Sequence, residues 1–467
     1  MLFNSIEFLV FLPIVFAIYW LLRKHLKLQN LFVVLASYVF YGWWDWRFLI
    51  LIAFTSFCSW GSGLLIEKSS NRKFWMIANI VINLGILATF KYYDFFVSEF
   101  GTLFGISTES LLLRIILPVG ISFYTFQALS YSIDVYRGNI KPTKDIIAFF
   151  AFISFFPQLV AGPIERATNL LPQFLQKRTF SYEQGVDGMR QILWGLFKKI
   201  VVADNCAMYV DQVWATYDTQ SGSTLLLAAV LFTFQIYGDF SGYSDIAIGT
   251  AKLFGIKLMR NFNNPYFSRD IAEFWRRWHI SLTTWFRDYV YIPMGGSRVS
   301  KAKIVRNTFV IFLLSGFWHG ANWTFIAWGV YHAVLFLPLI LLGMNRKYTS
   351  NDATWKDFPK MLLTFVLAVV GWIIFRSETI GQAWNFVSGI VDTSIITIPY
   401  VYSISWLLPM LLWLPLLVIV EWCNRKREHG LDIAHIGYKW QLTIYVMLTI
   451  VVFAFGATSE KFIYFQF

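Results

Sequence analysis

Long charge-free stretches constrain this chain more than any other feature. The 467-residue sequence contains eleven runs of at least 15 residues that lack Asp, Glu, Lys and Arg. A helical membrane crossing takes about 20 mostly apolar residues. The runs are 8–22, 28–44, 48–66, 74–90, 115–133, 146–164, 219–238, 307–345, 361–375, 393–420 and 440–459. Only 14% of the residues are charged, against about 25% in a soluble domain, so a soluble enzyme is excluded.

These runs predict an all-α polytopic membrane protein with about 11–12 transmembrane helices, because barrel strands would be shorter and would alternate. The run 307–345 is long enough for two crossings, and another span is expected near 190–214 despite the charges of Lys198 and Lys199. Neither a tandem repeat nor a low-complexity linker interrupts the pattern. A single membrane domain over 1–467 is therefore expected. The three cysteines are too widely spaced for a metal motif or a disulfide framework.

The loop charges predict an orientation, because Lys and Arg collect on the cytoplasmic side. Basic residues follow the first run at 23–27, whereas none precedes it. The acidic connection 376–392 is expected outside, and the basic stretch 425–427 inside. Both termini are therefore predicted to be extracytoplasmic, in a multi-pass protein of a bacterial cytoplasmic membrane.

The net charge of +12 is concentrated in one segment. Residues 252–306 carry eleven Lys and Arg against three acids. Such a segment either contacts anionic lipid headgroups or attracts an anionic donor to a cytoplasmic opening. Under the second interpretation, the donor-binding residues are Arg276, Arg277 and Arg287. Nucleic acid is not an expected partner, because Trp and Phe are interspersed with these charges beside membrane spans.

Two histidines lie in unusual surroundings. The segment 271–290 places Ile271, Trp275 and Trp278 at helical spacing opposite a charged face, which predicts an interfacial or re-entrant helix carrying His279. His319 is 13 residues past Arg306, roughly 20 Å along a helix at ~1.5 Å per residue. An ionisable group so deep in a membrane is a functional candidate, although each histidine could also be a hydrogen-bonded packing residue.

The surroundings of His319 favour proton transfer. Gly316 and Gly320 flank it, so a backbone, a bent helix or a substrate can approach, and Asn322 is placed to orient the ring. A neutral imidazole in a low-dielectric site suits a general base. No nucleophile elbow, Walker loop, HExxH or CxxC motif is visible. Two histidines alone make a weak metal site, so no metal and no bound cofactor are expected.

Several blocks resemble the membrane-bound O-acyltransferase (MBOAT) superfamily, in particular its bacterial alginate O-acetyltransferase branch. The resemblance runs almost end to end, and its two histidine-containing blocks are long and specific. The matching blocks are 155–166 (FFPQLVAGPIER), 235–249 (QIYGDFSGYSDIAIG), 274–296 (FWRRWHISLTTWFRDYVYIPMGG), 315–323 (SGFWHGANW) and 462–467 (FIYFQF).

The resemblance implies a funnel of helices around a central tunnel, where a cytoplasmic acyl donor meets an extracytoplasmic acceptor. His319 matches the catalytic histidine of the family, and His279 a second histidine of this branch. Acetyl-CoA is the expected donor substrate and an exported cell-envelope polysaccharide the acceptor. The acyl group would pass through a periplasmic or extracellular SGNH-type partner. Residues expected to line or orient the tunnel are Trp318, Asn322, Asp245 and Tyr464.

Two alternatives remain at this stage. One is transfer of D-alanine or a longer acyl group to teichoic acid or another envelope polymer. The other is a transporter or channel, because buried histidines also serve proton relays. No paired inverted repeats stand out, and the acidic candidates Asp239 and Asp245 could equally fix helix packing.

Tyr464 yields the first testable prediction. The aromatic tail 462–467 is either a membrane-interface belt or a segment that folds back toward His319, where the Tyr464 hydroxyl would accept an acyl group transiently. Tyr464→Phe keeps the aromatic ring and removes only the hydroxyl. A relay predicts near-complete loss of acyl transfer in the purified variant, whereas full transfer activity would leave only the belt.

Overall fold

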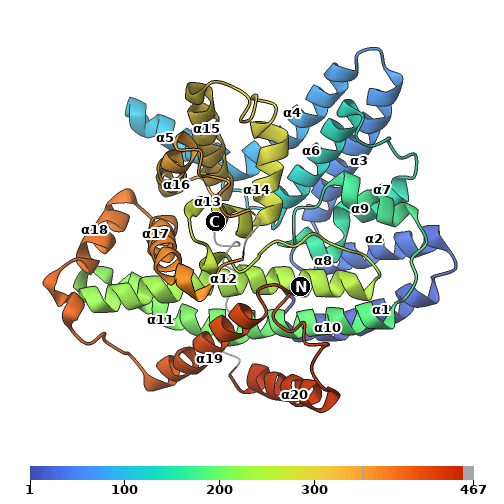
Figure 1. Cartoon of the computed structure of the whole chain (residues 1–467). Helices are drawn as coiled ribbons and strands as arrows, with labels where there is room; N and C mark the ends of the chain where they lie inside the picture. Colours follow the sequence, from blue (N-terminus) through green and yellow to red (C-terminus); the bar gives the residue numbers. More distant parts are fainter. Residues whose placement is uncertain (350–351, 456–467) are drawn as a thin grey trace. The chain divides into compact units, whose positions relative to one another are not determined.

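The computed structural model describes residues 1–349 and 352–455, and every regular element in those ranges is a helix (Figure 1). The chain forms two compact units. The first comprises residues 1–189 and 247–259, and the second comprises 190–246 and the described residues from 260 onward. Two of the three boundaries between the units fall inside helices, namely α10 (Tyr182–Leu196) and α12 (Gly222–Leu253). The expectation of one membrane domain stays a prediction.

The first unit contains nine complete α-helices. They are α1 (Ile6–Leu21), α2 (Leu26–Gly42), α3 (Phe48–Lys68), α4 (Arg72–Lys91), α5 (Tyr93–Phe104), α6 (Ile121–Arg137), α7 (Ile146–Ser154), α8 (Phe156–Leu159) and α9 (Ala167–Leu175). Helices α3, α4 and α6 pack on one another. A buried polar seam joins them, in which Asn79 donates to Ser132 at 2.6 Å and Ser59 donates to Asn79 at 3.2 Å. Such hydrogen bonds hold helices together in lipid, where burial of apolar surface contributes little to association.

The second unit contains the segments that carry the candidate residues. Its elements are the π-helix η2 (Phe197–Ala203), α11 (Asp204–Ala215), α13 (Ile271–Arg277), α14 (Ile280–Phe286), the π-helix η5 (Arg287–Tyr291), α15 (Lys301–His319), α16 (Trp323–Leu341), α17 (Phe358–Arg376), α18 (Ile380–Ile390), α19 (Ile404–Cys423) and α20 (Tyr438–Ala454). Helices α15 and α16 lie side by side (Figure 1), and α17 packs on α16.

Two glycines allow α15 and α16 to pack closely. A Cβ atom on Gly316 would lie 2.1 Å from the Phe325 carbonyl oxygen, and one on Gly329 would lie 2.4 Å from the Phe312 carbonyl oxygen. Small residues at helix interfaces are typical of membrane proteins, because close backbone approach increases van der Waals contact. Since Gly316 is one helical turn before His319, this packing also places the end of α15.

Within residues 1–349 and 352–455, five helices are long and apolar enough to cross a membrane, by length and composition. They are Phe48–Lys68, Arg72–Lys91, Gly222–Leu253, Trp323–Leu341 and Trp355–Arg376. Four shorter apolar helices accompany them, at Ile6–Leu21, Leu26–Gly42, Met410–Cys423 and Tyr438–Ala454. On α1, Ile6 and Leu21 are 77% and 81% exposed, as expected of side chains that contact lipid. The protein is therefore a multi-pass membrane protein.

Among the described residues, fewer helices reach this length than the 11–12 crossings expected, because α1, α2 and α20 have only 16 or 17 residues and some charge-free runs are not continuous helices. The run 146–164 divides into α7 and the short α8, with Phe155 outside the helical region between them. Pro157, two residues after Phe155, has no N–H to donate to a continuing helix. The run 307–345 divides into α15 and α16, as its length predicted.

The close packing at Gly316 gives a second prediction. Gly316→Ala should destabilise the fold by about 1–3 kcal/mol, because the added methyl group meets a backbone carbonyl rather than a flexible side chain. Gly381→Ala is the matched control, since its Cβ would have Thr379 Oγ1 at 3.9 Å as its neighbour. Thermal unfolding midpoints in detergent test the pair. Equal midpoints would contradict close packing at Gly316.

Candidate functional site

His319 is the last residue of α15 and is 6% exposed. The helix is continuous from Arg306 to His319, as the estimate of the distance along a helix assumed. The depth of His319 in the membrane stays a prediction. The rings of Trp328 and Phe375 meet the imidazole edge-on, with centroids 5.3 and 5.1 Å away. Helices α16 and α17 supply these rings, so His319 lies in an aromatic enclosure with little access to water.

The chain breaks between His319 and α16. Gly320 has extended backbone, and Asn322 caps the next helix by accepting from the Thr324 N–H at 2.9 Å. The Asn322 amide donates to the Glu378 carbonyl at 3.0 Å. These bonds fix the connection that follows His319, while the expected orientation of the imidazole by Asn322 stays a prediction.

His279 lies at a break that the sequence did not predict. The single helix expected over 271–290 is wrong, because α13 ends at Arg277 and α14 begins at Ile280. His279 has φ +43° and ψ +55°, the left-handed region that a bulky residue seldom adopts. The Ile280 N–H donates to the Asn261 carbonyl at 2.8 Å, and the Asn263 N–H donates to the Arg277 carbonyl at 2.9 Å. These bonds pair the break with an extended segment, which stabilises an otherwise unfavourable backbone.

Trp318 brings the two histidines together. Its ring centroid lies 5.8 Å from that of His279 and 4.9 Å from that of His319. All three side chains are buried, with exposed fractions of 1% for His279, 4% for Trp318 and 6% for His319. We call these three residues the histidine–tryptophan cluster. The sequence placed the histidines in separate segments, and the structure unites them on one tryptophan.

His279 lies outside the candidate spans, and its protonation follows from its burial. The rings of Phe240 and Phe262 pack against it, with centroids 4.7 and 6.4 Å away. Burial lowers the pKa of His279 to about 3, because an apolar environment disfavours the imidazolium. The imidazole is therefore neutral at physiological pH, which suits proton acceptance.

The three arginines expected to bind a donor lie in different environments. Arg277 forms an ion pair with the buried Glu273 at 2.9 Å, and Glu273 also holds Arg269 at 3.0 Å. Arg276 is half-buried and donates to the Asn345 carbonyl at 2.7 Å. The side chain of Arg287 is 58% exposed and contacts Asp288 at 2.7 Å. By exposure, Arg287 is the most accessible of the three to an incoming anion.

The remaining predicted residues differ in their outcome. Asp245 forms an ion pair with the buried Lys198 at 2.6 Å and accepts a hydrogen bond from Gln191 at 2.8 Å. These contacts contribute to helix packing, and the expected place of Asp245 in a tunnel stays a prediction. Tyr464 lies outside the described residues. Sequence reasoning missed Phe240 as a neighbour of His279. It also gave no role to Lys198 and Lys199, although charges inside an apolar stretch are a signal of buried ion pairs.

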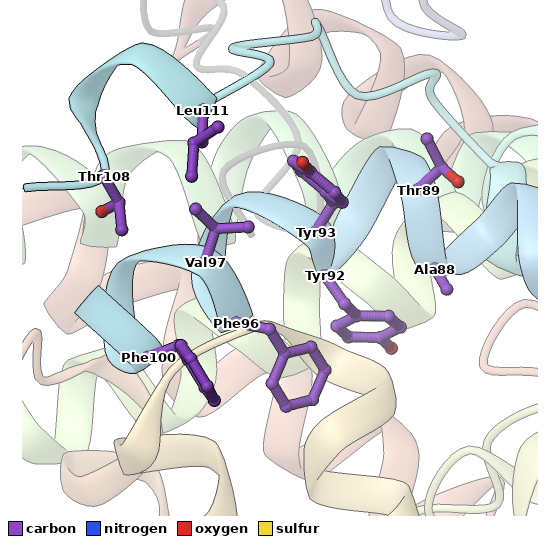
Figure 2. A pocket seen from close by; sticks show the side chains of 9 residues that line it. All are labelled: Ala88, Thr89, Tyr92, Tyr93, Phe96, Val97, Phe100, Thr108 and Leu111. Atoms are coloured by element: carbon purple, nitrogen blue, oxygen red, sulfur yellow. The ribbon is translucent and has the colours of Figure 1, made fainter. Parts of the chain in front are cut away.

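A cavity of about 420 Å³ lies in the first unit, between α4, α5 and the turn that follows (Figure 2). Tyr92, Tyr93, Phe96 and Phe100 line it, and none of the predicted site residues does. Within residues 1–349 and 352–455, no three His, Cys, Asp or Glu side chains group closely enough to hold a metal ion. The histidine–tryptophan cluster therefore remains the candidate site.

Comparisons with known proteins identify the family of this chain. The model of the membrane-bound O-acyltransferase family matches residues 141–374. The chain is 42% identical to "Probable alginate O-acetylase AlgI" of Pseudomonas aeruginosa, over 82% of this chain and 74% of the relative. It is 32% identical to a peptidoglycan O-acetyltransferase of Helicobacter pylori, over 100% and 98% of the two chains. It is 30% identical to a teichoic acid D-alanyltransferase of Bacillus subtilis, over 56% and 69%.

The matched region includes the whole histidine–tryptophan cluster and helix α15, which carries Trp318 and His319. The relatives share one type of activity, the transfer of an acyl group, although their names give different acceptors. The family resemblance expected from the sequence is thereby confirmed. The chain belongs to the membrane-bound O-acyltransferase family and is a multi-pass, helical O-acyltransferase.

Proposed function

We propose that the protein is an O-acetyltransferase that uses acetyl-CoA from the cytoplasm to acetylate an exported cell-envelope polysaccharide. The acetyl group would reach the polymer through an extracytoplasmic SGNH-type partner. The names of two relatives support this choice, since both describe acetylation of a glycan. The histidine–tryptophan cluster carries the proposal, because it buries two imidazoles beside one another in a membrane protein of this family.

In the proposed reaction His319 is the general base. Its imidazole takes the proton of an acceptor hydroxyl as the hydroxyl oxygen bonds to the acetyl carbon. The carbon–sulfur bond of the thioester then breaks, and the thiolate leaves and takes up a proton. A dry aromatic enclosure supports this step, because electrostatic interactions there are stronger than in water. His279 would contact the donor or the leaving thiolate from the other side of Trp318.

D-alanyl transfer to teichoic acid is the second candidate. A relative with that activity matches 56% of this chain, whereas both acetyltransferases match at least 82%. Purified protein incubated with radiolabelled acetyl-CoA distinguishes the candidates. Acetylation predicts that label reaches protein or glycan, in amounts that depend on His319. Label found only in free acetate, in the same amount without the enzyme, would contradict the proposal.

Removing the proposed base gives the third prediction. His319→Ala should lower acetyl transfer by about 10²–10⁴-fold, the usual contribution of a general base. His332→Gln is the control. His332 is buried like His319, but it belongs to α16 and lies outside the histidine–tryptophan cluster. Initial rates are measured on protein whose unfolding midpoint is unchanged. A His319 variant that keeps more than a tenth of the wild-type rate is incompatible with a base.

The basic segment gives the fourth prediction. Arg287→Ala should raise KM for acetyl-CoA by up to about fivefold with little effect on kcat, because an exposed charge contact contributes up to about 1 kcal/mol. A higher salt concentration should raise KM of the wild-type protein in the same way, since exposed charges are screened over about 8–10 Å. Arg277→Ala should instead lower the unfolding midpoint, because Arg277 pairs with buried Glu273.

The matched control for Arg287 is Arg47→Ala. Arg47 is also an exposed arginine paired with a nearby carboxylate, that of Asp45 at 2.6 Å, but it lies outside the basic segment. Steady-state kinetics at two salt concentrations provide the measurement. Equal KM values for both variants, independent of salt, would leave lipid headgroups as the only role for the segment.

A further inference from the structure

Two buried lysines of η2 contact α12. Lys199 forms ion pairs with Asp204 and with Asp239, both at 2.7 Å. Lys198 forms an ion pair with Asp245 at 2.6 Å. The lysine side chains are 4% exposed. Because buried charges are costly without a partner, these pairs strongly favour one alignment of η2 with α12.

Glycines allow the backbones of the same two segments to meet. A Cβ atom on Gly238 would lie 2.9 Å from the Lys198 carbonyl oxygen, and one on Gly242 would lie 3.0 Å from the backbone nitrogen of Lys199. Both glycines belong to α12 and flank Asp239. Close backbones and short ion pairs together leave α12 little freedom to rotate about its axis.

The residue after Asp239 contacts His279. Phe240 is fully buried, and its ring meets the imidazole edge-on with centroids 4.7 Å apart. Phe240 also packs against Phe262 at 5.0 Å, and the Phe262 ring is nearly parallel to that of His279. Adjacent residues project about 100° apart around a helix. A rotation of α12 that moved Asp239 away from Lys199 would therefore also move Phe240 relative to His279.

We propose that the Lys199–Asp239 ion pair positions His279 by fixing the rotation of α12, so that Phe240 supports the imidazole at its left-handed backbone position. Asp239 and Lys199 are positioning residues and do not touch substrate. The consequence for acyl transfer rests on the proposed function, whereas the effect on the burial of His279 does not.

A purely structural role is the competing explanation, in which the ion pair only holds helices together. The chain offers two internal comparisons. His332 is as buried as His279, at 1% exposure, but its ring packs on those of Trp275 and Trp328, with centroids 4.9 Å away. Asp187 pairs with Lys252 of α12 at 2.5 Å, in the other unit of the chain.

Asp239→Asn is the test variant, because Lys199 keeps Asp204 as a partner and the substitution preserves side-chain size. The probe is diethyl pyrocarbonate, which modifies neutral imidazoles that become accessible by local opening. Peptide mass spectrometry measures the rate at each histidine of the full-length protein in detergent. The rate at His279 should rise about fivefold or more while that at His332 is unchanged. Asp187→Asn should change neither rate.

Three outcomes would overturn the proposal: an unchanged rate at His279, an equal rise at His279 and His332, or the same rise in Asp187→Asn. If Asp239→Asn does not accumulate, Asp239→Glu keeps the charge and displaces the carboxylate by one methylene, with the same expected selectivity. In an acetyl-transfer assay, Asp239→Asn should lower kcat and leave KM for acetyl-CoA unchanged. An inactive wild-type protein would refute the proposed function alone, since the labelling result does not depend on activity.

Discussion

The ion pairs between the η2 lysines and the α12 aspartates are the interaction on which the second unit depends. In an apolar interior the attraction between opposite charges is strong, and so is the penalty for leaving one unpaired. Lys198 and Lys199 are therefore matched with Asp245 and with Asp204 and Asp239. Glycines on α12 allow the short distances that the pairs require. Helix α12 is thereby held close to η2, and it carries Phe240, whose ring packs on His279.

Aromatic rings surround the two imidazoles and give them an apolar environment. The Trp318 ring contacts both imidazoles, and the rings of Trp328 and Phe375 pack against His319. Such rings exclude water without offering charges that would compete for a proton. The left-handed backbone of His279 adds local strain, which is found mostly where surrounding structure over-determines a functional residue. An imidazole held in this way needs little rearrangement to accept a proton.

Much of the site could be anticipated from particular residues. The uncharged run around His319 indicated a buried histidine, and His319 is 6% exposed. That α15 ends at this residue came only from the structure. The break at His279 was not predictable, because Ile271, Trp275 and Trp278 follow helical spacing, and the backbone bonds to Asn261 and Asn263 that favour the break come from a separate segment. Likewise Arg277 looked available to an anion, but Glu273, four residues earlier, pairs with it.

The sequence by itself determined that this chain is a helical membrane protein, that His319 lies in a long uncharged stretch, and to which family it belongs. Those properties follow from apolar runs and local motifs, which act over one helix or less. Only the tertiary structure decided that Trp318 joins His279 to His319 and that Lys199 reaches Asp239. Lys199 and Asp239 are 40 positions apart along the chain, and Trp318 follows His279 by 39 positions. Their geometry depends on how whole helices rotate and cross, which the pattern within any one helix does not specify.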